Sequence, residues 1–357
     1  MKQVVTITGI RPDFIRMKEV FRRLDETFDH VMVHTGQHYD DALSRVFFED
    51  LQIRTPDHVL ETGTASRTHY EQLSYLSKEI CYLFEREQLD PDLILFLGDS
   101  NSVLVAPVLF KEGYSIGHIE GGMRSYDRRM PEEVNRVICD YVSDRIFVYT
   151  PAYKERLLKE NRPESAIHVV GNTITEIVRQ YRPTGPRPQN YLVADIHRNE
   201  NLSSPGQYRH ILQFLNTFGD TLGMPVKLVK FNRAFRMIEA HRLLDGLNRI
   251  EVVGPYGFLK YLELQYGARA VISDSGTCQE ECPLLGVPAI VPRNCTERPE
   301  SMEFGNSILV GEARPVDAMV ADAIGFLQQF TISDAQVAWL GDGRTSERIV
   351  TILKETL

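Results

Sequence analysis

Short runs of apolar and β-branched residues alternate along the chain with longer segments of helical periodicity. This rhythm predicts a parallel sheet whose strands are connected by helices, because parallel neighbours need a long crossover between them. In the first half the expected strands are residues 4–8, 31–35, 93–97, 115–119, 145–149 and 168–170. In the second half they are residues 191–195, 226–229, 250–253, 270–273 and 289–292. The predicted fold class is therefore α/β.

A segment without periodicity separates the two sets of strands. Residues 179–190 read RQYRPTGPRPQN, and this mixture of Pro, Gly and Arg is typical of a linker. We therefore expect one domain over residues 1–178 and a second over residues 179–345. Residues 346–357 have the pattern of an amphipathic helix that fits either domain. The length of 357 residues exceeds one ordinary core, so two domains with a cleft between them are expected.

Composition limits the partners of the protein. The formal net charge of −9 argues against nucleic acid as the main partner, because binding a duplex needs a dense field of Lys and Arg. No stretch approaches the ~20 apolar residues that span a bilayer. The N-terminal residues MKQVVTITGIRPDF also lack the long apolar region of a signal peptide. We expect a cytoplasmic protein that does not bind membranes.

The five cysteines predict free thiols rather than a metal centre. Their number is odd, and only Cys278 and Cys282 are closely spaced. The second pair that would complete a zinc site is missing from the sequence. We therefore expect no bound metal ion.

The first expected strand ends in GIRPD, a tight turn that opens a helix. Gly9 leaves room for a ligand to approach the backbone, and Arg11 is placed at the strand end to hold a phosphate. An ion pair between Arg11 and Asp13 is the alternative. Asp99, in GDSNS, also follows an apolar strand and lies at the edge where open α/β sheets bind ligands. Its alternative role is that of a helix N-cap.

Further carboxylates follow in the sequences HIEGGMRS and MPEEVNR. The alternation of a strand places His118 and Glu120 on the same side, and the two glycines after Glu120 leave space beside it. Glu132 and Glu133 lie in the first turn of the next expected helix, where carboxylates interact favourably with the helix dipole. Ordinary helix starts carry the same acids, so the residues alone leave both roles open.

The second half repeats this placement of polar residues at strand ends. His197 follows a strand in DIHRNEN, and a loop position favours a functional role over core packing. The sequence SDSGTCQEE runs from a strand into a helix, so the amides around Ser275 and Gly276 are suited to cradle a pyrophosphate. Glu281, further along that helix, is placed to accept hydrogen bonds from both ribose hydroxyls. Considered alone, the sequence TERPE, which contains Arg298, predicts a surface loop.

Taken in order, these motifs resemble the family of non-hydrolysing UDP-N-acetylglucosamine 2-epimerases. The resemblance covers nearly the whole chain and rests on GIRPDFIRM, HTGQHYD, GDSNS, HIEGGMRS, MPEEVNR, HRNEN, SDSGTCQEE, TERPE and the C-terminal GDGRTSERI. It implies a glycosyltransferase-B-like fold with two Rossmann-like domains, UDP held mainly by the second, and the last helix packed on the first. Members usually dimerise, so the resemblance implies a homodimer that binds a UDP-sugar.

The resemblance also implies roles for individual residues. The implied catalytic set is Asp99, Glu120, Glu132 and His197. The implied substrate-binding set is Arg11, Arg16, Arg124, Ser275, Gly276, Glu281 and Arg298. In HTGQHYD, the residues His34, Gln37 and His38 resemble the place where some bacterial members bind a second, activating substrate molecule. A surface loop of hydrogen-bonded residues is the alternative for this segment.

The chemistry implied by the resemblance explains why such groups are needed. The proton on C2 of a hexosamine is not next to a carbonyl, so direct deprotonation would leave an unstabilised carbanion. Oxidation by NAD would avoid this, but no G-x-G-x-x-G opens the first strand–helix unit, and we expect no cofactor. Elimination of UDP from C1 with loss of the C2 proton gives a 2-acetamidoglucal, which is re-protonated on the opposite face. Carboxylates must then move the proton, and cations or amides must stabilise the departing pyrophosphate.

Several positions depart from the common family pattern. Arg16 stands where many members have Lys, and EGGMR and DSGT replace the usual EAGLR and DSGG. Residues 229–233, VKFNR, replace a Pro-rich loop that contains His. These changes leave open a 2-epimerase of a related UDP-sugar, such as a 6-deoxy-L-hexosamine or a diacetamido uronic acid. A hydrolysing 2-epimerase that releases N-acetylmannosamine and a non-catalytic sugar-nucleotide sensor are further alternatives.

Overall fold

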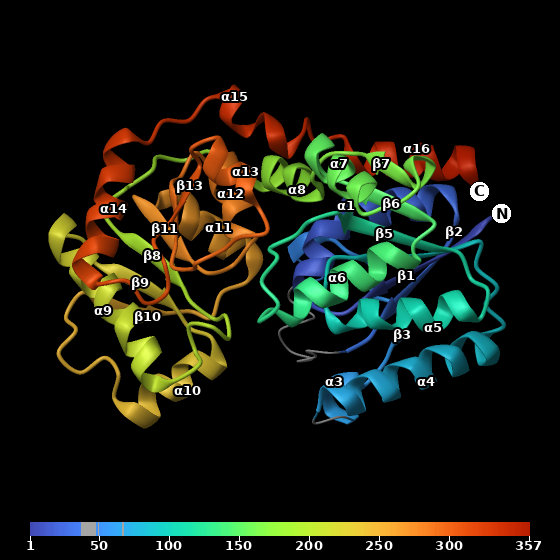
Figure 1. Ribbon diagram of the computed structural model, residues 1–357, viewed down its shortest axis with the longest axis horizontal. Helices are drawn as coiled ribbons and strands as arrows, with labels where there is room; N and C mark the ends of the chain where they lie inside the picture. The colour runs from blue at the N-terminus through green and yellow to red at the C-terminus, as the bar shows by residue number, and fades with distance from the viewer. Residues whose placement is uncertain (37–47, 49, 66–67) are drawn as a thin grey trace. The chain divides into compact units, whose positions relative to one another are not determined.

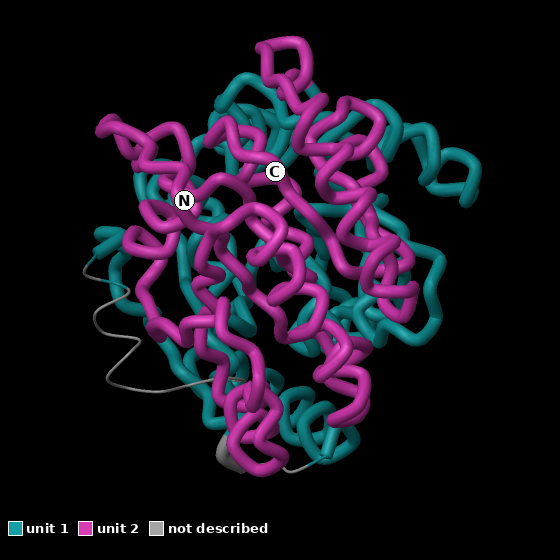
Figure 2. The backbone as a smooth tube through the Cα atoms, turned by 90° about the vertical axis from the view of Figure 1, so that its left-hand side faces the viewer, with its two compact units in different colours: residues 1–177, 339–357 teal, residues 178–338 magenta. Residues whose placement is uncertain are grey.

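The chain folds into two compact units, each built on its own parallel sheet (Figures 1 and 2). The computed structural model describes residues 1–36, 48, 50–65 and 68–357. Unit 1 consists of Met1–Ile177 together with Trp339–Leu357. Unit 2 consists of Val178–Ala338. The order of strands in each sheet is that of a Rossmann-like fold.

Unit 1 contains a seven-stranded sheet in the order β3-β2-β1-β4-β5-β6-β7. Its strands are β1 (Gln3–Thr8), β2 (Asp29–His34), β3 (His58–Val59), β4 (Leu93–Leu97), β5 (Ile116–Gly121), β6 (Arg145–Val148) and β7 (Ile167–Val169). Continuous apolar runs such as LILFL in β4, whose five residues are all buried, are typical of parallel strands covered on both faces. The order reverses between β1 and β4, so the loops after these strands lie at a switch point, where open sheets bind ligands.

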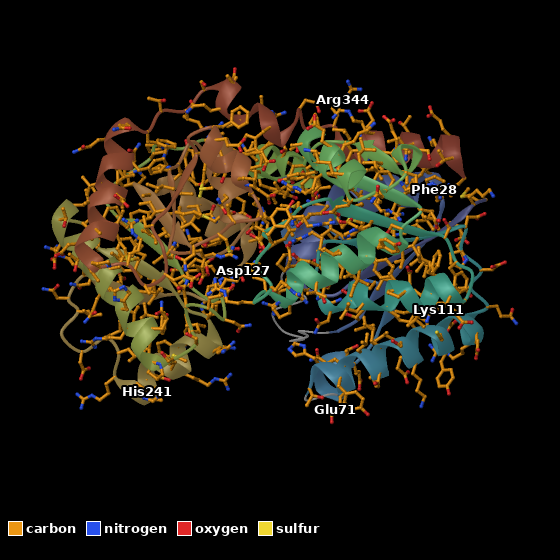
Figure 3. All side chains as sticks on the ribbon, in the orientation of Figure 1. Phe28, Glu71, Lys111, Asp127, His241 and Arg344 are labelled. Atoms are coloured by element: carbon orange, nitrogen blue, oxygen red, sulfur yellow. The ribbon has the colours of Figure 1, made fainter. Side chains whose placement is uncertain are left out.

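Helices of unit 1 connect these strands (Figure 1). They are α1 (Arg11–Thr27), α3 (Thr62–Ala65), α4 (His69–Glu87), α5 (Ala106–Lys111), α6 (Pro131–Val142) and α7 (Pro151–Lys159), with 3₁₀ turns at Asn101–Val105 and Glu164–Ala166. α8 (Thr173–Tyr181) follows the last strand, β7, and begins in unit 1. The apolar residues buried by α1 share one helix face: Phe14, Met17, Val20, Phe21 and Leu24. Polar side chains on outer faces point into solvent, as Glu71 on α4 and Lys111 on α5 do (Figure 3).

Unit 2 contains a six-stranded sheet in the order β10-β9-β8-β11-β12-β13. Its strands are β8 (Leu192–Asp195), β9 (Val226–Val229), β10 (Ile250–Val253), β11 (Ala270–Ser273), β12 (Ala289–Val291) and β13 (Ser307–Leu309). Its helices are α9 (Pro205–Leu222), α10 (Asn232–His241), α11 (Phe258–Gly267), α12 (Cys278–Leu285), α13 (Pro299–Glu303), α14 (Val316–Gln329) and α15 (Asp334–Val337). The sequence sets the bounds of α9: the Ser204 hydroxyl caps its start, and Gly223, with φ 64°, ends it.

The chain returns to unit 1 at Trp339 and continues through a 3₁₀ turn into α16 (Thr345–Thr356), which packs against α1. Leu340 is fully buried, and its carbonyl oxygen accepts a hydrogen bond from Thr175 Oγ1 (2.9 Å). The return therefore begins before the amphipathic helix that the sequence predicts at residues 346–357.

The two parallel sheets confirm the α/β class and the two Rossmann-like units, and the last helix packs on the first unit as the resemblance implies. Two short strands, β3 and β13, are absent from the sequence prediction. The chain crosses between the units within α8, which runs to Tyr181 and so extends past the expected start of the linker at residue 179. None of the helices in the described ranges is long and apolar enough to cross a membrane.

Candidate active site

The loops after four neighbouring strands of unit 1 gather polar residues at one edge of the sheet. β1, β4, β5 and β6 are adjacent in the sheet and run parallel, so their carboxyl ends meet. This edge carries Arg11 after β1, Asp99 after β4, Glu120 at the end of β5 and Tyr149 after β6. The structure therefore places Asp99 and Glu120 at a shared edge of the sheet.

Glu120 is buried among polar partners. Its carboxylate forms an ion pair with Arg16 of α1 and accepts a hydrogen bond from Tyr149 Oη (3.2 Å). The guanidinium carbon of Arg16 lies 5.6 Å from the centre of the Tyr149 ring, within the range of a cation–π contact. Because a buried carboxylate is stable only when it is paired and hydrogen-bonded, these partners fix Glu120 in one position.

The backbone at Glu120 departs from a regular strand. Its φ of 75° lies in the left-handed region, and the pairing of β5 with β6 shifts register between Ile119 and Gly121. Such geometry at a non-glycine residue is frequent at functional sites. The regular alternation from which the sequence places His118 beside Glu120 is interrupted here, and His118 instead pairs with the buried Asp140 (2.8 Å).

Asp99 forms an ion pair with Arg136, which reaches it from α6. The buried Arg136 also lies 3.2 Å from Glu133. On the same helix, Asn135 Nδ2 donates a hydrogen bond to the carbonyl oxygen of Asp99 (2.9 Å). The alternative role of Asp99 as a helix cap is wrong, because Ser100 occupies the cap position of the 3₁₀ helix that follows.

The two acids at the start of α6 have different surroundings. Glu133 is buried, and its carboxylate accepts hydrogen bonds from the backbone N–H groups of Ser125 and Tyr126 (2.9 Å each). It therefore holds the loop between β5 and α6. Glu132 is half-buried in the first turn of the helix. Of these two acids, Glu132 keeps the candidate role.

Asp13, in the first turn of α1, is a buried carboxyl group at the same edge. Its Oδ2 accepts hydrogen bonds from the backbone N–H groups of Gly9 (2.8 Å) and Ile10 (3.1 Å). Burial raises the pKa of Asp13 to about 7 against the effect of these hydrogen bonds, and the charges of Asp99 and Glu120 add to the rise. The site therefore includes a carboxyl group that holds a proton in the neutral pH range.

The structure changes the interpretation of the turn after β1. A Cβ atom at Gly9 would lie 2.5 Å from the Ser100 hydroxyl and 2.3 Å from the Ser102 hydroxyl. The close approach that requires glycine is therefore made by the loop after β4, not by a ligand as predicted. Arg11 forms no ion pair with Asp13 within the described residues, because the Asp13 carboxylate is engaged by the backbone.

Arg124 lies in an internal charge network of unit 1. One terminal nitrogen donates to Asp140 (2.8 Å), and its Nε and other terminal nitrogen donate to Glu160 (3.1 and 2.6 Å). These contacts engage the whole guanidinium group and stabilise the loop after β5. A substrate contact of Arg124 stays a prediction.

In unit 2, Asp274 joins the loops that follow β8 and β11. The carboxylate of this fully buried residue accepts hydrogen bonds from the backbone N–H groups of His197 and Arg198 (3.0 Å each). It also accepts one from Asn201 Nδ2 (3.0 Å). These bonds bring the backbone of His197 to the turn that contains Ser275, the residue after Asp274.

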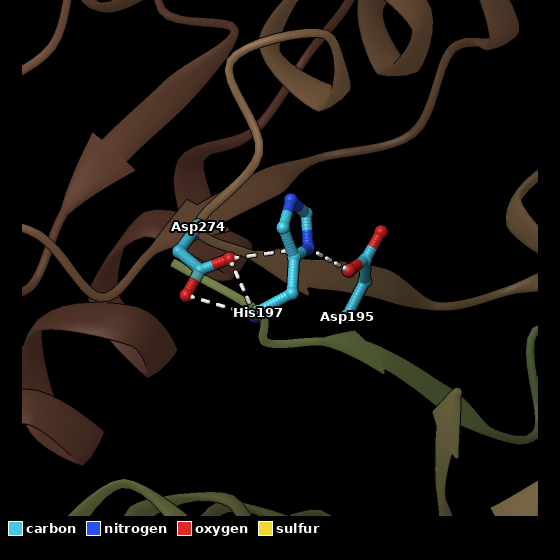
Figure 4. Close-up of side chains that lie close together, drawn as sticks. All are labelled: Asp195, His197 and Asp274. Carbon is cyan, nitrogen blue, oxygen red and sulfur yellow. Dashed lines mark hydrogen bonds and ion pairs between the residues drawn. The ribbon is translucent and has the colours of Figure 1, made fainter. Parts of the chain in front are cut away.

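The ring of His197 stands between two carboxylates (Figure 4). Its Nδ1 lies 2.7 Å from Asp195 and 3.5 Å from Asp274. Burial lowers the pKa of His197, but the charge and hydrogen bond of Asp195, followed by the charge of Asp274, outweigh burial and raise it above 6.5. Phe231, from the loop that departs from the family pattern, packs on the ring with 4.7 Å between ring centres.

This group of Asp195, His197 and Asp274 also has the spacing of metal ligands, with candidate atoms within 4.8 Å of one another. Their carboxylate oxygens, however, already accept hydrogen bonds from N–H and O–H groups of unit 2. A metal ion would have to replace these bonds. The arrangement therefore fits a histidine held in one orientation better than it fits a metal centre.

The turn before α12 combines backbone amides with a cation. Ser275 Oγ and Thr277 Oγ1 are hydrogen-bonded at 3.0 Å. Arg298 crosses the turn, since a Cβ atom at Gly276 would lie 2.1 Å from its guanidinium nitrogen. Arg298 is buried, and its Nε lies 2.9 Å from the buried Glu280. A helix N-terminus next to a fixed guanidinium group suits the binding of a phosphate.

Glu281 lies on α12, and its carboxylate accepts a hydrogen bond from Gln265 Nε2 of α11 (2.8 Å). Both side chains are buried, so this bond fixes the orientation of the acid predicted to bind ribose. At the other predicted ligand site, Gln37 and His38 lie outside the described residues. His34 is buried, its Nδ1 lies 3.2 Å from the carbonyl oxygen of Thr8, and burial lowers its pKa to about 4.

Comparison with known proteins decides the family. The family model described as UDP-N-acetylglucosamine 2-epimerase matches residues 22–354 of the chain. The chain belongs to the UDP-N-acetylglucosamine 2-epimerase family. The family that the sequence motifs resemble is thereby confirmed.

Individual relatives match over nearly their whole length. A UDP-N-acetylglucosamine 2-epimerase of Methanocaldococcus jannaschii is 33% identical over 97% of each chain. A UDP-2,3-diacetamido-2,3-dideoxy-D-glucuronate 2-epimerase of Pseudomonas aeruginosa is 34% identical over 98% of this chain and 99% of its own. The crystal structure of the M. jannaschii UDP-GlcNAc 2-epimerase in complex with UDP-GlcNAc and UDP superposes with a TM-score of 0.90 over 99% of this chain and 100% of its own, at 32% identity. This similarity supports the glycosyltransferase-B-like fold expected for a family member.

Sequence reasoning missed the residues that hold the candidate groups of this family member in place. Tyr149 follows β6 directly, and Asp195 is the last residue of β8, so their positions at strand ends were available signals. Arg136 lies one helical turn after Glu132 on α6, but only the fold shows that it reaches Asp99.

Proposed function

We propose that this protein is an isomerase that interconverts UDP-N-acetylglucosamine and UDP-N-acetylmannosamine at C2. The group of carboxylates at the edge of unit 1, with Glu120 buried against Arg16 and Asp99 paired with Arg136, carries the proposal. Two such groups serve the two faces of one carbon atom, as inversion at C2 requires. Membership of the 2-epimerase family and the relatives of that name support the same substrate.

In the proposed reaction, a carboxylate removes the C2 proton while the bond between C1 and the UDP oxygen breaks. The products of this step are a 2-acetamidoglucal and UDP. A second acid returns a proton to the opposite face of C2, and UDP adds back at C1 so that only C2 is inverted. Asp99, Glu120 and Glu132 are the proposed proton-transfer groups, and the ion pairs of the first two keep them in fixed positions.

The UDP part is proposed to bind to unit 2. The amides of Ser275 and Gly276 at the start of α12, together with Arg298, suit the pyrophosphate, and Glu281 suits the ribose hydroxyls. His197, whose loop is bonded to the same turn, is proposed to stabilise the phosphate that leaves C1. Arg11, the first residue of α1 in unit 1, is a further proposed phosphate ligand.

A second candidate substrate is a UDP-diacetamido uronic acid. The Pseudomonas aeruginosa relative, which is named for this sugar, is as similar to the chain as the first relative. Phe231, in the segment that departs from the common pattern, packs directly on His197, so the change affects the surroundings of a proposed catalytic residue.

Incubation of the protein with each UDP-sugar, followed by proton NMR, separates these activities. The proposal expects UDP-ManNAc from UDP-GlcNAc with no net release of UDP. Free N-acetylmannosamine and UDP would indicate the hydrolysing reaction, and turnover of only the diacetamido uronic acid would favour the second candidate. Binding of both sugars without turnover of either would refute an epimerase.

Exchange of the C2 proton with D₂O then tests the individual carboxylates. We expect Asp99→Asn, Glu120→Gln and Glu132→Gln each to slow deuterium incorporation at C2 by roughly 100-fold or more, because general acid–base groups contribute on that scale. Glu26→Gln, on the exposed side of α1, is the control and should exchange at the wild-type rate. Exchange at the wild-type rate in all three site variants would remove the proposed assignment.

We also propose that the enzyme is a cytoplasmic homodimer. Val134, Val137 and Tyr141 expose a stripe of large apolar side chains along α6, and Phe110 on the contacting α5 is about half exposed. Contiguous exposed apolar residues are typical of protein interfaces. Sedimentation of the protein and of Val137→Glu tests this, and a wild-type monomer at micromolar concentration would contradict it. The five free thiols fit a reducing compartment.

A further inference from the structure

Asp195 is a buried acid at the end of β8 to which the motifs assign no role. Its Oδ1 lies 2.7 Å from Nδ1 of His197, and its Oδ2 accepts a hydrogen bond from Tyr261 Oη of α11 (2.8 Å). Each carboxylate oxygen therefore has its own partner. Because an ionised carboxylate only accepts hydrogen bonds, Nδ1 must carry a proton in both the neutral and the charged ring.

This assignment decides what the other ring nitrogen can do. Figure 4 shows Nε2 of His197 pointing away from both Asp195 and Asp274. With the Nδ1 proton held by Asp195, Nε2 accepts a hydrogen bond when the ring is neutral and donates one when the ring is charged. The negative charge of Asp195 favours the charged ring. Phe231, packed on the ring face, limits rotation away from this position.

The other charged groups around the ring have different tasks. Asp274 also favours a charged ring, but its carboxylate is committed to backbone N–H groups and builds the loop. Arg198 opposes a charged ring. Burial and the charge of Asp195 hold the pKa of Tyr261 well above 10, so that its hydroxyl remains a donor. Asp195 is therefore the group that acts on Nδ1 and can be changed without dismantling the loop.

We propose that Asp195, held by Tyr261, is a positioning residue that keeps a proton on Nδ1 of His197 and presents Nε2 as a charged hydrogen-bond donor to the pyrophosphate of UDP. This inference rests on the proposed function, because it takes UDP as the ligand of the adjacent turn at Ser275. It extends that function by adding two residues, Asp195 and Tyr261, that orient the ring of His197 and favour its charged form. Both act through His197 and neither touches the substrate.

The pH dependence of UDP binding tests the proposal. The charged ring binds the pyrophosphate best, so affinity should fall as pH rises through the pKa of His197. Asp195→Asn removes the charge and should move this fall to lower pH by about one unit or more. The alkaline limb of kcat/KM should move by the same amount. Asp322→Asn, an exposed acid of unit 2 paired with Arg314, is the control and should leave both profiles unchanged.

A second variant separates charge from orientation. Tyr261→Phe keeps the charge of Asp195 but removes its hydrogen bond, so kcat should fall while the pH midpoint remains within a few tenths of a unit of wild type. Nitrogen NMR of histidine-labelled protein at a pH above the pKa of His197, with the His197 signals identified by their loss in His197→Gln, should show the Nδ1–H tautomer of the neutral ring in the wild type. The Nε2–H tautomer, or an unchanged pH midpoint in Asp195→Asn, would overturn the proposal.

The same measurements distinguish failure of the inference from failure of the proposed function. If UDP does not bind to the wild type, the proposed nucleotide site is refuted, and with it the proposal that Asp195 and Tyr261 prepare His197 to bind pyrophosphate. If UDP binds and the UDP-sugar is epimerised while Asp195→Asn leaves the pH profiles and the tautomer unchanged, the proposed epimerase activity is retained and the positioning role of Asp195 is refuted.

Discussion

Asp13 should make the stability of unit 1 depend on pH in the neutral range. The residue is buried, and one carboxylate oxygen accepts both backbone N–H groups of the turn after β1. Asp13→Asn retains an oxygen that can accept the same two hydrogen bonds but cannot ionise. The substitution therefore isolates the energetic effect of the charge.

The magnitude follows from the raised pKa of Asp13, about 7 in the folded protein against 3.8 as the ordinary value. Between these values the folded chain holds a proton that the unfolded chain has released, so the free energy of unfolding falls as pH rises. Each pH unit corresponds to about 1.4 kcal/mol. From pH 5 to 8 the wild type should therefore lose about 3 kcal/mol relative to Asp13→Asn, with little further change above pH 8.

Urea unfolding at pH 5, 6, 7 and 8 measures this difference. The chain has a single tryptophan, Trp339, which is buried in unit 1 and whose fluorescence reports the unfolding of that unit. The exposed Asp50→Asn is the control for a changed charge in the same unit. A constant difference between wild type and Asp13→Asn at all four pH values would show that Asp13 is ionised throughout, and the reasoning from burial would be wrong.

Three further substitutions test other parts of the structure. Gly276→Ala should displace Arg298 and weaken UDP binding by about tenfold or more, whereas Gly185→Ala, with open space around it, should bind UDP like the wild type in calorimetry. Leu353→Ala should lower the free energy of unfolding of unit 1 by about 2–5 kcal/mol in urea titrations, because this residue of α16 is fully buried; a loss below 1 kcal/mol would contradict the packing. Arg124→Gln should destabilise unit 1 by about 1–3 kcal/mol in the same assay, because the buried Asp140 keeps His118 and the Gly122 N–H as partners and Glu160 is partly exposed; unchanged stability with a higher KM would instead indicate a substrate contact.

Much of the fold was predictable because the strands are buried on both faces. Such strands appear in the sequence as short apolar runs, and β4 and β11 are examples in which every residue is buried. β3, with two residues, and β13, with three, are too short to show a pattern. The candidate site was predictable to the same degree, because polar residues directly after a buried parallel strand must lie at one edge of the sheet.

The remaining features of the site depend on contacts between distant segments. Arg136 reaches Asp99 from another element, and no local pattern in the sequence reveals that pairing. The left-handed backbone of Glu120 was equally hidden, because residues other than glycine rarely adopt it. The sequence predicts a ligand in the space beside Gly9, because only the folded chain shows the two serine hydroxyls that fill this space.

The return of the chain to unit 1 has a consequence for the order in which the units can fold. Unit 2 is one continuous segment, whereas unit 1 includes Trp339–Leu357 from beyond unit 2. In a chain that lacks residues 345–357, unit 2 therefore retains all of its own residues, while the apolar surface of α1 that packs against α16 lacks its cover. Such a truncated chain should bind chaperones through unit 1 rather than unit 2.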